Sequence, residues 1–227
     1  MQIQNHALVL VAGTVLLIDP QISPSQRQAA IDSTLYAQLV ANKRAGNRFT
    51  EPATWDRAYR AVYAELGWLV TSQAHDEQSV PGVAGLAISP ALQAWFGQAG
   101  IDGGQVLRSV FESLREHPDG LRQLQGFIRS DTADGHLAKL EIGLMEADMR
   151  LHLCSLSWQS TAAVEAAEQP SLSEIATLPA EVQLRCLSLL CDAQSFETKR
   201  SQLRMLMDKK QHEHAYVLEL PTQNRRM

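Results

Sequence analysis

Basic residues are too few and too scattered in this sequence to form a nucleic-acid-binding surface. The 227 residues include 20 Lys and Arg against 25 Asp and Glu, which gives a formal net charge of −5. Non-specific binding to nucleic acid depends on a clustered positive surface. The densest basic group, Arg225 and Arg226, is too short to serve as a binding arm. We therefore expect no nucleic-acid partner.

The chain also lacks an apolar run long enough to span a membrane. The best candidate, Ala7–Ile18, is 12 residues long, whereas a spanning helix needs about 20. No basic region precedes it and no small-residue cleavage site follows it, so it does not match a secretory signal peptide. We expect a buried strand, with a membrane-contacting segment as the open alternative. We therefore expect the protein to be synthesised in the cytoplasm without a classical signal peptide. Secretion by a non-classical route is the open alternative.

Cysteine is scarce. The sequence contains an odd number of cysteines, namely Cys154, Cys186 and Cys191, and their spacing does not match a metal site. The pattern favours three small buried apolar side chains in a reducing compartment. One disulfide with one free thiol is the alternative.

Motifs for catalysis, cofactors and metals are missing as well. The sequence contains no G-x-S-x-G nucleophile elbow and no phosphate-binding loop ending in Lys-Ser or Lys-Thr. His212 and His214 are close in sequence, but no second pair completes a four-ligand zinc site, so we interpret them as part of a solvated turn. We expect no metal and no cofactor.

The best candidate for an enzymatic site is a histidine that lies close to a cysteine in the sequence. His152 and Cys154 are two residues apart on a predicted strand, so both side chains lie on the same face, which we expect to be wet. A protonated imidazole can lower the pKa of a neighbouring thiol. No third residue completes the site, and we predict no catalytic residue.

What the sequence does contain is a change in hydrophobic period. Up to about Ser130 the apolar residues recur every three or four positions, which is typical of helices. From His136 to Trp158 they recur every two, which predicts an antiparallel hairpin with one buried and one wet face. The residues assigned to the buried face are Ala138, Leu140, Ile142, Leu144, Met149, Leu151 and Leu153.

Several element boundaries can be read from capping chemistry. Ser23, Pro24 and Gln26 form a capping box that starts a helix, and Gly46 ends it. A second helix starts at Pro52 and ends at Gly67, and a short strand follows. Further elements are predicted as follows: helices near 106–114, 121–128 and Ser195–Lys210, a strand at Val182–Cys191 for which a helix is nearly as good, and an edge strand at Ala215–Leu220.

These elements predict a single α+β domain over residues 1–227. Its helical part covers about 19–130, and its antiparallel β part covers about 136–220, with a late C-terminal helix. Helices and strands are segregated along the chain, which disfavours an alternating βαβ sheet. The segment Ala162–Ser173, rich in Ala and Glu, reads as a surface linker or short helix.

Aromatic residues concentrate in the first hundred positions and suggest a contact surface. The stretch Val83–Phe96 is apolar, uncharged and interrupted by Gly and Pro. Large exposed apolar patches usually mark interaction sites, whereas the alternative is an ordinary core. The predicted surface consists of Val83, Leu86, Ile88, Leu92, Trp95 and Phe96.

Three function classes remain open. The first is a non-enzymatic interaction protein that binds a protein partner or self-associates as an oligomer through this surface. The second is a membrane-active bacterial effector or toxin component that binds lipid or forms a pore. The third is an enzyme with a Cys-based site. Because fold alone does not decide function, the absence of site chemistry places the first class ahead.

Overall fold

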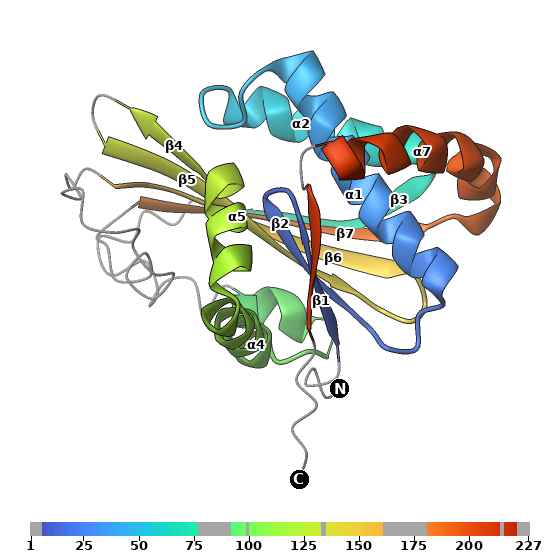
Figure 1. The fold of residues 1–227 in the computed structure, drawn as a ribbon, viewed down its shortest axis with the longest axis horizontal. Helices are drawn as coiled ribbons and strands as arrows, with labels where there is room; N and C mark the ends of the chain where they lie inside the picture. Colours follow the sequence, from blue (N-terminus) through green and yellow to red (C-terminus); the bar gives the residue numbers. More distant parts are fainter. Residues whose placement is uncertain are drawn as a thin grey trace, which may run out of the picture.

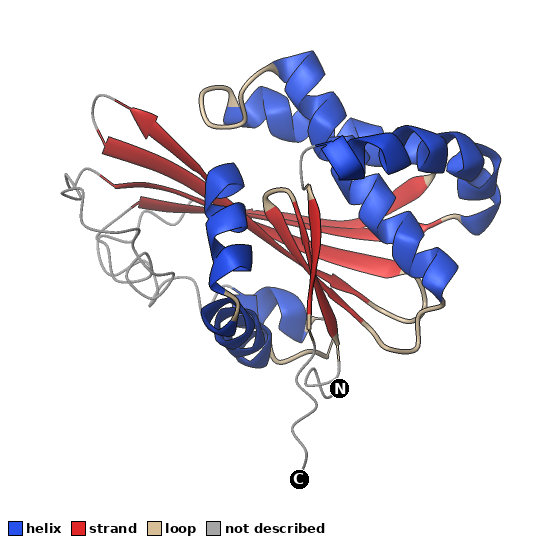
Figure 2. Ribbon diagram, viewed as in Figure 1, coloured by secondary structure: helices blue, strands red, loops and turns tan. Residues whose placement is uncertain are grey.

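A mixed sheet between two layers of helices forms the body of the protein (Figures 1 and 2). The computed structural model describes residues 6–76, 92–98, 100–132, 135–160, 181–213 and 216–221. Helices α1, α2 and α7 cover one face of the sheet, and α4 and α5 cover the other. The predicted α+β class is confirmed.

The sheet has eight strands, seven of which follow the order β3-β7-β6-β5-β2-β1-β8, while β4 pairs with β5. All pairings are antiparallel except β2 with β5. The strands are β1 (Ala7–Val11), β2 (Thr14–Ile18), β3 (Trp68–Asp76), β4 (Arg129–Thr132), β5 (Gly135–Met145), β6 (Arg150–Ser160), β7 (Glu181–Cys191) and β8 (Val217–Leu220). The helices are α1 (Pro24–Ala45), α2 (Pro52–Leu66), α4 (Gly103–Glu116), α5 (Pro118–Ile128) and α7 (Ala193–Glu213).

The apolar segment Ala7–Ile18 is a tight hairpin. It contains two strands, β1 and β2, and Ala12 at the turn has a φ of 48°. The hairpin lies inside the sheet, because β2 pairs with β5 and β1 pairs with β8. The expectation of a buried strand is therefore right in kind, but the segment folds back on itself. No helix among the described residues is both long and apolar enough to cross a bilayer.

The predicted helix ends are confirmed at α1 and α2. The Ser23 hydroxyl accepts from the Gln26 amide, and the Gln26 side chain accepts from the Ser23 amide, which completes the capping box. Gly46 follows α1, and Gly67 ends α2 with a φ of 95°, a left-handed conformation that favours glycine. The two helices form an antiparallel pair on the sheet (Figure 1).

The later elements are also confirmed. The helices and β7 are longer than predicted, whereas the edge strand β8 is shorter than the predicted Ala215–Leu220. The ambiguous stretch Val182–Cys191 is strand β7, which supplies the third strand beside the β5–β6 hairpin. The late helix is α7, and β8 forms the sheet edge beside β1. The segment Ala162–Ser173 lies outside the described residues.

The prediction of one wet face on the β5–β6 hairpin is wrong. Lys139 on β5 is 3% exposed and His152 on β6 is 6% exposed, although both were assigned to the wet face. The predicted apolar sets also point to opposite sides, since Ile142 pairs with Cys154, whereas Leu153 pairs with Gly143. The physical reason is the second helical layer, which covers the face that a single-layer hairpin would leave to water.

Candidate ligand-binding pocket

A row of polar side chains crosses the sheet beneath α2. The strand register aligns Thr14 on β2 with Glu141 on β5, Glu141 with Ser155 on β6, and Ser155 with Arg185 on β7. Residues directly opposite each other in a sheet point to the same face. The same face carries Leu153 and Leu187, which belong to the core beneath α1, α2 and α7. Polar groups are thus gathered where the helical layer meets the sheet.

Glu141 is buried and anchored through one of its two carboxyl oxygens. Its Oε1 accepts from the Thr14 hydroxyl at 2.8 Å and from the Tyr59 hydroxyl at 2.7 Å. Burial raises the pKa of Glu141, while these two hydrogen bonds act in the opposite direction. Both hydrogen bonds described for the side chain end on Oε1, so Oε2 remains for a further contact.

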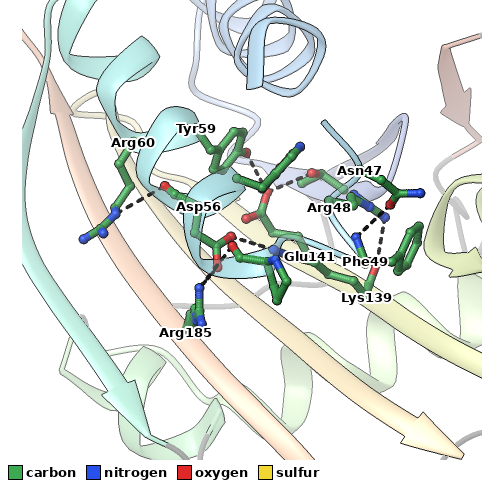
Figure 3. Close-up of polar contacts among 12 residues, drawn as sticks. Asn47, Arg48, Phe49, Asp56, Tyr59, Arg60, Lys139, Glu141 and Arg185 are labelled. Carbon is green, nitrogen blue, oxygen red and sulfur yellow. Dashed lines mark hydrogen bonds and ion pairs between the residues drawn. The ribbon is translucent and has the colours of Figure 1, made fainter. Parts of the chain in front are cut away.

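Asp56 on α2 connects the helix to two strands (Figure 3). Its Oδ1 lies 2.5 Å from the Lys139 ammonium, and its Oδ2 pairs with the Arg185 guanidinium. Burial lowers the pKa of Lys139 to about 7, and the nearby Arg48 acts in the same direction. Glu141 acts in the opposite direction on this pKa, and the ion pair with Asp56 and the ring of Trp55, 4.5 Å from the ammonium, also favour the charged form.

Arg48 fixes the connection between α1 and α2 onto the sheet. Its Nη2 donates to the Phe127 carbonyl at 2.6 Å and to the Lys139 carbonyl at 2.9 Å. Burial lowers the pKa of Arg48 to about 10. A Cβ at Gly13 would lie 2.3 Å from Arg48 Nη2, so a larger residue at this turn would displace the guanidinium from its two carbonyl partners. Arg48 therefore serves the structure.

A pocket of about 450 Å³ opens between α2 and strands β3, β5, β6 and β7. Its lining is formed by Ala53, Asp56, Arg57, Tyr59, Arg60, Gln73, Ala74, Glu141, Leu153, Ser155, Arg185, Cys186 and Leu187. Arg57 and Arg60 are exposed, whereas Glu141 and Ser155 are buried, so the arginines lie toward solvent and the latter two lie deep. A pocket of this size is in the range of small-molecule sites.

Ser155 is the unexplained residue in this pocket. It is 6% exposed, and its hydroxyl makes no hydrogen bond to any residue that the structure describes. An unpaired buried hydroxyl costs about 1–3 kcal/mol. Its neighbour across the β5–β6 ladder is Glu141, whose Oε2 also remains for a further contact. The two groups together form a polar floor that a bound molecule could satisfy.

The predicted interaction surface is placed only in part. Val83, Leu86 and Ile88 lie outside the described residues. Leu92, Trp95 and Phe96 lie on a helical segment, residues 92–97, and are 0%, 5% and 0% exposed. They pack in the core shared with α4 and α5. Their role in an interaction stays a prediction, and it requires this segment to leave the sheet.

The Cys-based site is not assembled. The Cys154 sulfur lies 3.4 Å from that of Cys186, and burial raises the pKa of Cys154 well above its usual value. His152 instead contacts the Ser188 hydroxyl at 2.7 Å and Glu146 at 2.9 Å. The thiolate that a Cys nucleophile needs is disfavoured here. All three cysteines are free. Cys154 and Cys186 are buried as expected, whereas Cys191, which was also expected to be buried, is half-buried.

Metal-binding groups are not gathered in the part of the chain that the structure describes. There, no three His, Cys, Asp or Glu side chains lie close enough to hold an ion. His212 falls in the last turn of α7, not in a turn outside it, and His214 is outside the described residues. The expectation of no metal stays a prediction for that pair.

Comparison with known proteins gives similarity of structure only. No family model matches the sequence, and no curated protein matches it. The activated Cyt2Ba monomer from Bacillus thuringiensis subsp. israelensis is similar, with 12% identity and a TM-score of 0.42 over 79% of this chain and 95% of that one. A delta-endotoxin has 12% identity and a TM-score of 0.37 over 79% of each chain.

The Evf virulence factor is similar over 88% of this chain and 84% of its own, with 10% identity and a TM-score of 0.40. All three TM-scores lie below 0.5. The function proposed below therefore depends on this chain's own residues.

Proposed function

We propose that this protein is a non-enzymatic binding protein that holds a small molecule in the pocket beneath α2. The observation that carries the proposal is the unpaired, buried hydroxyl of Ser155, a residue that lies opposite Glu141 on the β5–β6 ladder. Buried polar groups in folded proteins are nearly always hydrogen-bonded. A ligand supplies the missing partners. The proposal keeps the binding class expected from the sequence but moves the site from an aromatic surface to a polar pocket.

The pocket itself can be tested by filling it. Ala53 lines the pocket on α2, and Ala61 is exposed on the same helix outside the lining. We expect Ala53→Trp to abolish binding of fragments detected by ligand-observed NMR with the wild-type protein, whereas Ala61→Trp preserves it. A mixed fragment library of neutral, cationic and anionic molecules serves as the probe. If no fragment distinguishes the two variants, the pocket is not a binding site.

A membrane-active effector or toxin component is the second candidate. It is favoured by exposed large apolar side chains, namely Leu69 (55%) and Val70 (46%) on β3 and Met205 (71%) and Leu206 (45%) on α7. Exposed apolar surface can serve lipid contact or self-association. Liposome flotation, combined with light scattering on the same sample, distinguishes lipid contact from self-association. Loss of flotation in Met205→Ser/Leu206→Ser, with an unchanged melting temperature, would support lipid contact.

A further inference from the structure

We infer that the pocket beneath α2 takes a small hydroxylated organic anion, such as a sugar acid or a sugar phosphate. Its anionic group lies at Arg57 and Arg60, and one of its hydroxyls contacts Glu141 and Ser155. This inference rests on the proposed function and names the chemistry of the ligand.

The charge of the lining favours an anion at the mouth. Three guanidinium groups line the pocket, from Arg57, Arg60 and Arg185. Arg185 is already paired with Asp56, which also pairs with Lys139. Two cations are left at the mouth, in a protein whose overall charge is −5. Guanidinium groups bind carboxylates and phosphates through charge-assisted, often bidentate hydrogen bonds.

Neither arginine at the mouth is neutralised by a carboxylate of the described chain. Arg60 donates to two neutral oxygens, the Asp56 carbonyl at 3.4 Å and the Gln73 side chain at 2.8 Å. Arg57 makes no ion pair with any residue that the structure describes. Both are exposed, so a ligand's acidic group can reach them without burying an uncompensated charge.

The floor favours a neutral hydroxyl. A hydroxyl both donates and accepts, so it can donate to one of the pair Glu141 and Ser155 and accept from the other. An anionic group at this depth would meet the Glu141 carboxyl in a buried setting, which is unfavourable. Burial raises the pKa of Glu141, so its carboxyl group can also donate when it is protonated. The ligand is therefore oriented with its anionic group at the mouth of the pocket and its hydroxyl at the floor.

The walls leave space for a ring or short chain between the two ends. Ala53 and Ala74 are small, and Leu153 and Leu187 supply apolar contact beside the polar floor. Small-molecule sites commonly combine such apolar walls with a few fixed polar groups. The Tyr59 hydroxyl is committed to Glu141 and Tyr63, so it orients the floor without competing for the ligand.

The experiment measures binding of D-gluconate, D-glucose 6-phosphate, neutral D-glucose and inorganic phosphate by NMR titration. The variants are Arg57→Ala/Arg60→Ala, Ser155→Ala and, as a control for lost charge, Arg122→Ala, an exposed arginine of α5 paired with Asp119. We expect gluconate or glucose 6-phosphate to bind more tightly than glucose and phosphate. Binding should weaken about tenfold or more in the double variant and several-fold in Ser155→Ala. The control should bind normally.

Each alternative outcome overturns a defined part of the inference. Equal, pocket-dependent binding of neutral glucose, or fragment hits that are neutral or cationic, would remove the anion and leave the proposed function standing. Equal binding of gluconate and phosphate without an effect of Ser155→Ala would show a surface anion patch and remove the hydroxyl contact. Absence of binding by both sugar anions would overturn the inference, and the fragment comparison of Ala53→Trp with Ala61→Trp then decides the proposed function.

Discussion

Lys139 on β5 and Asp56 on α2 form an ion pair at the junction between the sheet and the helical layer, with 2.5 Å between Nζ and Oδ1. The Lys139 side chain is 4% exposed and that of Asp56 is 13% exposed. The pair defines the position of the first turns of α2 above the strands. Asp56 also pairs with Arg185, so its carboxylate is committed to these two cations and is not paired with Arg57 or Arg60.

Removal of the Asp56 charge should destabilise the protein strongly. Asp56→Asn leaves the buried Lys139 ammonium and the Arg185 guanidinium without their carboxylate. Breaking a buried pair from one side typically costs about 3–5 kcal/mol. We expect a loss near the lower end, measured as the free energy of unfolding in urea, because Asp56 is not fully buried.

Two further variants make this result specific. Asp119→Asn removes a carboxylate that is 92% exposed and pairs with Arg122, so it should change stability by less than about 1 kcal/mol. Asp56→Asn/Lys139→Met should recover part of the loss, since no buried ammonium is left unpaired. Equal stability of Asp56→Asn and Asp119→Asn would show that the ion pair contributes little.

The raised pKa of Glu141 predicts a pH-dependent stability. A carboxyl group whose pKa is higher in the folded protein than its usual value of 4.5 binds its proton more tightly when folded. Its contribution is fully present below pH 4.5 and is lost as the pH rises through the folded pKa. Glu141→Gln keeps an acceptor for Thr14 and Tyr59 but cannot ionise. The variant should therefore gain stability relative to wild type as the pH rises from 4.5. If the difference in the free energy of unfolding between Glu141→Gln and wild type does not change with pH over this range, the raised pKa of Glu141 is contradicted.

Ser155→Ala should stabilise the protein in the absence of ligand. The hydroxyl is buried and has no partner among the described residues, so its removal relieves a desolvation cost of about 1–3 kcal/mol. A rise in melting temperature is the expected result. Ser188→Ala is the matched control, because the Ser188 hydroxyl is also buried in the sheet but contacts His152 at 2.7 Å. That variant should lose stability. A loss in both variants would mean that the Ser155 hydroxyl has a partner.

Trp95→Ala distinguishes core from contact surface. Trp95 is 5% exposed and packs with the core of α4 and α5, which predicts a loss of about 3–5 kcal/mol in the free energy of unfolding. A contact surface predicts near-normal stability with weakened self-association or lipid binding. Chemical denaturation and light scattering on the same preparation report both quantities.

Local chemistry accounts for what could be predicted of the fold. The ends of α1 and α2 depend on Ser23, Gln26, Gly46 and Gly67, whose effects extend over only a few neighbouring residues. The same holds for the two-residue period of β5 and β6. The turn that splits Ala7–Ile18 was missed because it contains a single glycine within an unbroken apolar run.

Long-range relationships account for what could not be predicted. The pocket takes Asp56 from α2 and Glu141, Ser155 and Arg185 from three strands, and no spacing in the sequence links them. Polar positions on alternating strands were assigned to solvent, whereas a second helical layer covers them. The sequence did contain one signal that could have indicated this polar site. Lys139 and Glu141 lie on the same face of one strand and carry opposite charges.

The position of the β1–β2 hairpin has a consequence for how the chain reaches its native state. Its two strands are five residues long each and are joined by a tight turn, so the hairpin can close within microseconds. Its sheet neighbours, β5 and β8, lie more than a hundred residues further along the chain. Such distant pairing slows folding because the intervening chain must lose its freedom first. Until β5 and β8 arrive, both apolar edges of the hairpin stay open, and it is there that newly made chains would be most prone to aggregate or to need a chaperone.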